Sequence, residues 1–179
     1  MKVVILYAIV STNAKCVNST CYLIVNTTSM AALKVVIAVD GSKNADLAFR
    51  YYVDHFHRPQ NEVIALYTTP PVMSPLYSKK YSALTEDLKS SLHIERDNHA
   101  AEVKEIYDKL ATDIDKYSFY HLTDVERPGA GICQFVKENK CDSVVIGSRG
   151  MGVVKRTILG SVSDYVIHHA HVPVTVVNQ

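Results

Sequence analysis

The 179-residue sequence has little excess charge, few cysteines and no long apolar run. Lysine and arginine number 19 against 18 aspartate and glutamate residues, so the chain has no broad basic field for nucleic acid. No apolar run reaches the length of about 20 residues that a membrane-spanning helix requires. Four cysteines are too few and too scattered for a disulfide framework in a domain of this size. These absences favour one soluble globular domain of a reducing compartment, without nucleic-acid or membrane partners.

Acidic residues are absent from residues 1–29, which contain Lys2 and Lys15 as their only charged side chains. From Met30 onward the two signs nearly cancel. We therefore place the one domain boundary here, with residues 1–30 as a non-domain leader and residues 31–179 as the domain. Three interpretations of the leader stay open: a mispredicted start, a weak secretory signal peptide built on the apolar run 3–10, or an extra strand.

Short apolar runs alternate with amphipathic helical patterns from residue 33 onward. The apolar runs predict five strands, at residues 33–39, 63–67, 119–125, 142–146 and 172–177. The first helix is predicted to begin after the N-cap Ser42 and to stop before Pro59. This order is typical of a doubly wound α/β fold, a parallel sheet with helices on both faces. Pro173 removes a ladder donor, so we expect the last strand at a sheet edge or beside a partner chain.

A glycine-containing loop follows the fourth strand with the spacing G-x2-G-x9-G-S, formed by Gly147, Gly150, Gly160 and Ser161. Glycines let a backbone approach an anion, and the free amides and dipole of a following helix favour negative charge. In open parallel sheets, ligands bind at the carboxyl ends of strands where the strand order reverses. Asp40 ends the first strand. We expect the first and fourth strands to be neighbours, which places Asp40 and the loop in one crevice.

Other polar residues near the loop have more than one interpretation. Asp40 is a candidate magnesium ligand, a ribose or base contact, or only the former of an Asp-Gly turn. Arg149 is either a phosphate contact or a solvated loop residue. His168, His169 and His171 suggest a metal site, but adjacent helical residues diverge by about 100°, and imidazoles that interact with the last carbonyls of a helix are favoured.

With these residues assembled, the chain resembles the universal stress protein family over residues 32–178. The resemblance is carried by VIAVDGS at 36–42, IGSRGMG at 146–152, ILGSVS at 158–163 and HVPVTVV at 171–177. It implies a five-stranded parallel sheet of order 3-2-1-4-5, which is flavodoxin-like and similar to adenine nucleotide α hydrolases. It also implies ATP as ligand, with Mg²⁺, and a homodimer that pairs through the last strand, 172–177.

The resemblance places ATP against a defined set of residues. Asp40, with Ala38 and Val39, would line the site and reach nucleotide-bound Mg²⁺. The backbone around Ile64 and Ala65 would lie near the adenine. The phosphates and ribose would face the loop and its flanks, namely Ile146, Gly147, Gly150, Gly160, Ser161 and Val162, with Arg149 as the loop cation. No role transfers to residues 70–82.

The leading hypothesis is an ATP-binding protein of the stress response that holds its nucleotide as a structural or regulatory ligand. It is predicted to be cytoplasmic, where ATP is abundant, and secretory only if residues 1–29 are a genuine signal. We assign no catalytic residue, because the sequence identifies no second group that would complete the chemistry with Asp40. Two alternatives stay open: a slow ATP hydrolase or nucleotidyl-transfer enzyme on the same fold, and an adaptor whose pocket is empty or holds another nucleotide.

Overall fold

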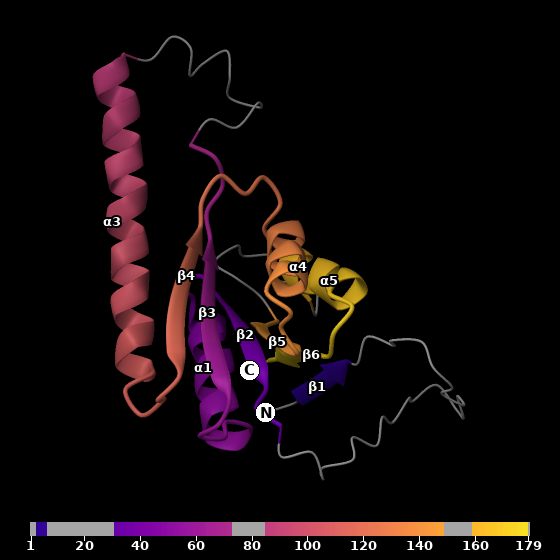
Figure 1. Cartoon of the computed structure of the whole chain (residues 1–179). Helices are drawn as coiled ribbons and strands as arrows, with labels where there is room; N and C mark the ends of the chain where they lie inside the picture. The colour runs from indigo at the N-terminus through magenta and orange to yellow at the C-terminus, as the bar shows by residue number, and fades with distance from the viewer. Residues whose placement is uncertain (1–2, 7–30, 73–84, 149–158, 179) are drawn as a thin grey trace.

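The computed structural model describes residues 3–6, 31–72, 85–148 and 159–178. Its strands form one six-stranded sheet with the order β1-β6-β5-β2-β3-β4 (Figure 1). The strands are β1 (Val3–Leu6), β2 (Lys34–Val39), β3 (Glu62–Thr68), β4 (Tyr117–Leu122), β5 (Ser143–Gly147) and β6 (Val174–Val177). The helices of the described residues are α1 (Lys43–His55), α3 (Glu86–Leu110), α4 (Pro128–Glu138) and α5 (Ser161–His169).

The strands β2 to β6 run parallel in the order β4-β3-β2-β5-β6. Counted along the chain from residue 33, this is the order 3-2-1-4-5, so the predicted doubly wound α/β fold is confirmed. The chain moves outward from β2 to β4 and then returns to the other side of β2 to form β5. The strands β2 and β5 are therefore the neighbours at the point where the strand order reverses.

A sixth strand, β1, was not included in the predicted sheet. It pairs antiparallel with β6 along all four of its residues. Because β1 lies on the outer side of β6, the last strand is not at the edge of the described sheet, contrary to the expectation from Pro173. Pro173 also precedes β6, and its carbonyl accepts a hydrogen bond from the amide of Val144 at 2.9 Å. The role of residues 1–30 as a leader stays a prediction.

Side chains of each strand alternate between two buried layers, as a pleated strand requires. In β2, Val35, Ile37 and Val39 pack in the layer under α1 and α3, whereas Val36 and Ala38 pack in the layer under α4 and α5. Figure 1 shows α3 beside β4 and the pair α4 and α5 on the other side of the sheet. Because both faces are covered, the central strands are apolar throughout, which is the pattern that identified them.

The helix α1 forms as its sequence predicts. Ser42 is the N-cap, and its hydroxyl accepts a hydrogen bond from the amide of Ala45 at 3.2 Å. The helix ends at His55, with Phe56 as its C-cap, so the chain leaves the helix before Pro59. Its stripe Ala45, Ala48, Phe49 and Tyr52 is buried.

The observed strands differ from the predicted bounds by one to three residues at several ends, and most at β4. The third predicted strand is β4, which ends at Leu122 rather than at residue 125, because Asp124 adopts a left-handed φ of 59° that interrupts an extended chain. The segment before it forms one helix, α3, of 25 residues. None of the helices described combines the length and apolar character that crossing a membrane would require.

Candidate functional site

The carboxyl ends of β2 and β5 lie side by side, at the edge of the sheet where the crevice is predicted. Ala38 of β2 is paired with Ile146 of β5, and the two chains leave the sheet after Val39 and Gly147. Asp40 and Ser148, the next residues of each chain, therefore lie at the same edge. The expectation that Asp40 and the loop meet across the strand-order reversal agrees with this register.

Asp40 holds the turn that leads into α1. Its Oδ1 accepts a hydrogen bond from the amide of Ser42 at 3.0 Å, and Gly41 between them has a φ of 75°, which L side chains rarely adopt. A Cβ on Gly41 would also lie 3.3 Å from Cγ2 of Val103. The contact fits the turn-forming interpretation of Asp40. A ligand role for this carboxylate stays a prediction.

The negative charge of Asp40 acts on Tyr67 of the neighbouring strand β3. Burial raises the pKa of Tyr67 above its usual value, and the charge of Asp40 raises the pKa further. Tyr67 also stacks on His121 of β4, with ring centroids 5.2 Å apart. Burial lowers the pKa of His121, and the positive charge of the nearby Arg96 lowers it further. Beside Asp40 on this side therefore lie two aromatic rings, Tyr67 and His121, whose neutral forms are favoured.

Gly147 is required by packing at the end of β5. A Cβ at this position would lie 2.8 Å from the backbone carbon and oxygen of Asn44 in the first turn of α1. Real Cβ atoms do not approach backbone atoms so closely, so any side chain here would push α1 away from the sheet. The first glycine of the motif therefore sets the distance between α1 and β5, whatever ligand the crevice binds.

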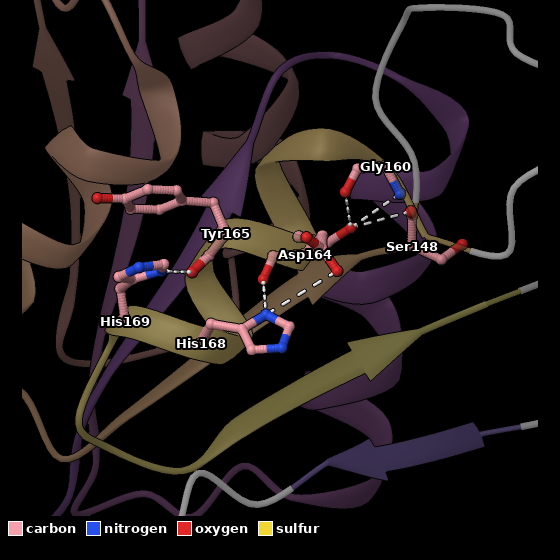
Figure 2. Close-up of polar contacts among 7 residues, drawn as sticks. Ser148, Gly160, Asp164, Tyr165, His168 and His169 are labelled. Carbon is pink, nitrogen blue, oxygen red and sulfur yellow. Dashed lines mark hydrogen bonds and ion pairs between the residues drawn. The ribbon is translucent and has the colours of Figure 1, made fainter.

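A set of hydrogen bonds holds the two ends of the glycine loop together, and we call it the loop clasp: Ser148, Gly160 and Ser163 (Figure 2). The amide of Gly160 donates to the carbonyl of Ser148 at 2.7 Å. The hydroxyl of Ser163 accepts from the same amide at 3.1 Å and lies 3.1 Å from the carbonyl oxygen of Ser148 and 2.9 Å from that of Gly160. The clasp closes the loop that contains Arg149 and Gly150, two predicted site residues that lie outside the described residues.

The sheet anchors the same clasp from below. The amide of Ser148 donates to the carbonyl of Val177 at 2.8 Å, and its hydroxyl donates to Oδ1 of Asn178 at 2.8 Å. Ser148 and Ser163 are both buried, at 1% and 2% exposure. The loop therefore starts and ends at fixed points of the β5–β6 edge.

The N-terminus of α5 faces this loop without a side-chain cap. Gly160 is its N-cap and has no side chain, whereas Ser42 caps α1 with its own hydroxyl. The first amides of α5 belong to Ser161, which is exposed, and Val162, which is half-buried. Amides at a helix N-terminus attract anions, and a glycine N-cap leaves them accessible to a ligand oxygen.

The apolar residues of the predicted site lie within the sheet. Ala38, Ile64 and Ile146 pack under α4 and α5, and Val39 and Ala65 pack under α1 and α3. Ile64 and Ala65 are in the middle of β3, and the carboxyl end of that strand is formed by Tyr67 and Thr68. The structure thus brings Asp40, Gly147, Gly160, Ser161 and Val162 to one edge and leaves Ile64 and Ala65 deeper in the core.

Ser163 is a member of the clasp that the motif did not single out. The sequence carried a signal for it, because a serine at the third helical position is well placed to accept the N-cap amide. We expect Ser163→Ala to lower the free energy of unfolding by about 1–3 kcal/mol, since it leaves buried clasp groups without a partner. Ser161→Ala, the matched control on an exposed hydroxyl, should change it by less than about 0.5 kcal/mol. Urea denaturation measures both, and equal losses would contradict the clasp.

The histidines at the end of α5 contact their own helix. Nδ1 of His168 lies 2.7 Å from the carbonyl oxygen of Asp164, and Nδ1 of His169 lies 2.8 Å from that of Tyr165 (Figure 2). The imidazoles thus contact carbonyls of their own helix one turn earlier, rather than the last carbonyls, which were predicted. Within the described part of the chain, no three His, Cys, Asp or Glu side chains are grouped so as to hold a metal ion.

A second hollow, with a volume of about 460 Å³, lies between the end of β4 and α4. Its lining includes the apolar residues Leu122, Val125 and Phe135, and acidic residues outnumber basic ones among its charged lining residues: Asp124, Glu126, Glu138 and Arg127. Acidic side chains repel phosphate, so this hollow is less suited to a polyphosphate than the α5 N-terminus.

Fold and site together define a flavodoxin-like α/β protein whose glycine loop is closed at the strand-order reversal. The family model of the universal stress proteins matches residues 32–178, and the chain belongs to this family. Among its relatives, the universal stress protein PHOS32 of Arabidopsis thaliana is 30% identical over 162 residues. That match covers 84% of this chain and 66% of PHOS32, so the chain spans about two thirds of the length of this relative.

Solved structures have the same fold. The protein MJ0577 superposes with a TM-score of 0.66 at 23% identity, covering 82% of this chain and 96% of that chain. A universal stress protein family protein of Arabidopsis thaliana, At3g01520, has AMP bound; it superposes with a TM-score of 0.54 at 19% identity, covering 82% and 92%. At these identities the likeness concerns the fold.

Proposed function

We propose that this protein binds ATP in the crevice between β2 and β5 and holds it as a structural or regulatory ligand in a stress response. The observation that carries the proposal is the loop clasp. It fixes both ends of a glycine loop beside the N-terminus of α5, where the N-cap Gly160 leaves the first amides open to an anion. The AMP held by At3g01520 supports an adenine nucleotide as the ligand class.

In this proposal the phosphates lie against the amides of Ser161 and Val162, with Gly147, Gly150 and Arg149 along the loop. Asp40, at the opposite side of the crevice, faces the Mg²⁺ that accompanies ATP or the ribose. A bound Mg²⁺ would neutralise part of the phosphate charge. A carboxylate such as that of Asp40 is the kind of oxygen ligand that Mg²⁺ takes. The nucleotide contributes binding energy to the folded state, so it stabilises the protein by mass action.

Self-association through the last strand, 172–177, belongs to the same proposal and requires that β1 leave the outer side of β6. A two-fold axis perpendicular to the strands makes two copies of β6 antiparallel, which is the geometry of an isologous strand pair. A cytoplasmic location also stays a proposal, and it follows from the abundance of ATP there.

The proposal is tested by the melting temperature with and without ATP and Mg²⁺. We expect ATP at about 100 times its Kd to stabilise the protein by about 2.7 kcal/mol. Gly160→Asp should lose this effect, with an ATP affinity at least about tenfold weaker, because its carboxylate caps α5 itself and repels phosphate. The backbone of Gly160, with φ −80° and ψ 159°, is open to any residue.

Gly160→Asn is the matched control, since it has the same shape and capping ability without the charge. It should bind ATP more tightly than Gly160→Asp. Absence of any ATP-dependent rise in the wild-type melting temperature would refute ATP binding. ATP turnover above background that disappears in Asp40→Ala, with binding retained, would instead identify a slow hydrolase. Mass spectrometry of the co-purified ligand distinguishes ATP from another nucleotide.

A further inference from the structure

The outer edge of β6 is occupied by a strand of the same chain. β1 pairs antiparallel with β6, with Val4 opposite Val176 and Leu6 opposite Val174. The other five strands are all parallel, so β1 is the single antiparallel addition to the described sheet. An unpaired sheet edge is a template for another strand, and here the chain itself supplies that strand.

The direction of the β6 backbone can be read from its bonds to β5. The carbonyl of Pro173 accepts a hydrogen bond from β5, and that of Val177 accepts one from Ser148. The backbone groups of these two residues therefore point toward β5. Backbone groups alternate in direction along a strand, so the backbone N–H and C=O groups of Val174 and Val176 point toward β1. The pairs Val4–Val176 and Leu6–Val174 are the hydrogen-bonded pairs, whereas the amides of Val3 and Ile5 point away from β6.

We propose that β1 is a displaceable edge strand that competes with a second copy of this chain for β6, and so keeps the protein monomeric while it is docked. This inference rests on the proposed self-association through the last strand. The second copy is the fitting competitor because β6 (VTVV) matches β1 (VVIL) in length and apolar character. A two-fold axis also gives it the antiparallel direction that this edge accepts.

Competition favours β1 for a simple reason. A strand tethered to the same chain acts on β6 at an effective concentration on the order of millimolar, well above that of a second copy in dilute solution. Only four residues of β1 pair with β6, so the docked state rests on a few bonds and is open to displacement. Release of β1 would expose the edge and allow two copies to associate.

The test compares two proline variants by light scattering over a wide range of protein concentration. Val4→Pro removes an amide that faces β6, whereas Ile5→Pro, the matched control, removes one that points away. We expect the wild type and Ile5→Pro to have the monomer mass of 19.9 kDa and Val4→Pro to form a dimer, with a dimer Kd at least about tenfold lower. Melting curves of both variants establish that they are folded.

A disulfide lock gives the opposite change. Ile5 and Thr175 are directly opposite each other and form a non-hydrogen-bonded pair, whose usual Cα separation of about 4.5 Å fits a disulfide. Oxidised Ile5→Cys/Thr175→Cys should stay monomeric at concentrations at which Val4→Pro is dimeric.

Each result decides between the claims. Equal dimerisation of the wild type and Val4→Pro would overturn the competition while leaving self-association intact. A folded Val4→Pro that stays monomeric would overturn both, without affecting ATP binding, which the melting-temperature experiment tests alone. A dimer of the oxidised lock would place the interface away from β6 and would also overturn the inference.

Discussion

Phe49→Ala is expected to lower the free energy of unfolding by about 3–5 kcal/mol. The Phe49 side chain is fully buried in the layer between the sheet, α1 and α3. Its ring lies 5.4 Å from that of Tyr107 in α3 and 6.2 Å from that of Tyr117 in β4. Alanine leaves a cavity that three separate elements line, and packed elements relax into such a cavity only in part.

Phe56→Ala is the matched control, because Phe56 caps the same helix and is 43% exposed. It should cost less than about 1 kcal/mol, since a large part of the residue already contacts water. Urea denaturation with a common slope measures both changes. Similar losses in the two variants would contradict the packing of α1 against α3. The result bears on the site as well, because α1 begins directly after the Asp40 turn and contacts Gly147.

Stability should fall steeply above pH 10, because buried tyrosines that stay protonated in the folded state ionise once the chain unfolds. Burial raises the pKa of Tyr107, and the hydrogen bond to Asp46 and the nearby carboxylate charges raise it further. Burial, with the charge of Asp108, likewise raises the pKa of Tyr117. A tyrosine whose pKa is raised in the folded state contributes its full stabilisation below the unfolded pKa of about 10. That contribution is progressively lost as the pH rises above this value. Each tyrosine contributes a slope of about 1.4 kcal/mol per pH unit.

Tyr107→Phe separates this effect from general alkaline denaturation. At pH 8 the variant should be less stable by about 1–3 kcal/mol, because it lacks the 2.7 Å bond from the Tyr107 hydroxyl to Oδ1 of Asp46. Above pH 10 it has one ionising group fewer. The gap between the two proteins should therefore narrow by about 1.4 kcal/mol per pH unit. Urea denaturation at several pH values measures the gap, and a constant difference would show that Tyr107 titrates normally.

Local patterns in the sequence were sufficient for most elements of the fold. The apolar runs identified the five parallel strands, because a strand covered on both faces has no polar side to interrupt the run. Ser42 identified the start of α1, since a cap depends on residues only a few positions apart. The end of β4 was placed too late, because Val125 is apolar and the left-handed Asp124 before it leaves no mark in hydrophobic periodicity.

The arrangement of the candidate site was predictable where it depends on the ends of neighbouring strands. Asp40 and Gly147 were expected in one crevice, and the β2–β5 register places them at one edge. The backbone of Ile64 and Ala65 was expected near an adenine, and both residues lie in the middle of β3 with core side chains. Their contact with a nucleotide stays a prediction, because a sequence pattern does not give the depth that a ligand reaches along a strand.

The sequence by itself determined the α/β class, the strand order implied by its resemblance, and the glycine spacing that ends at Gly160 and Ser161. Each of these follows from local periodicity or from residues at fixed separations. Only the tertiary structure decided that the backbone of Asn44 leaves no room for a side chain at Gly147, that Ser163 joins the loop clasp, and that β1 pairs with the outer edge of β6. Those three features depend on contacts between distant segments, which form only when the sheet and its two helical layers are assembled.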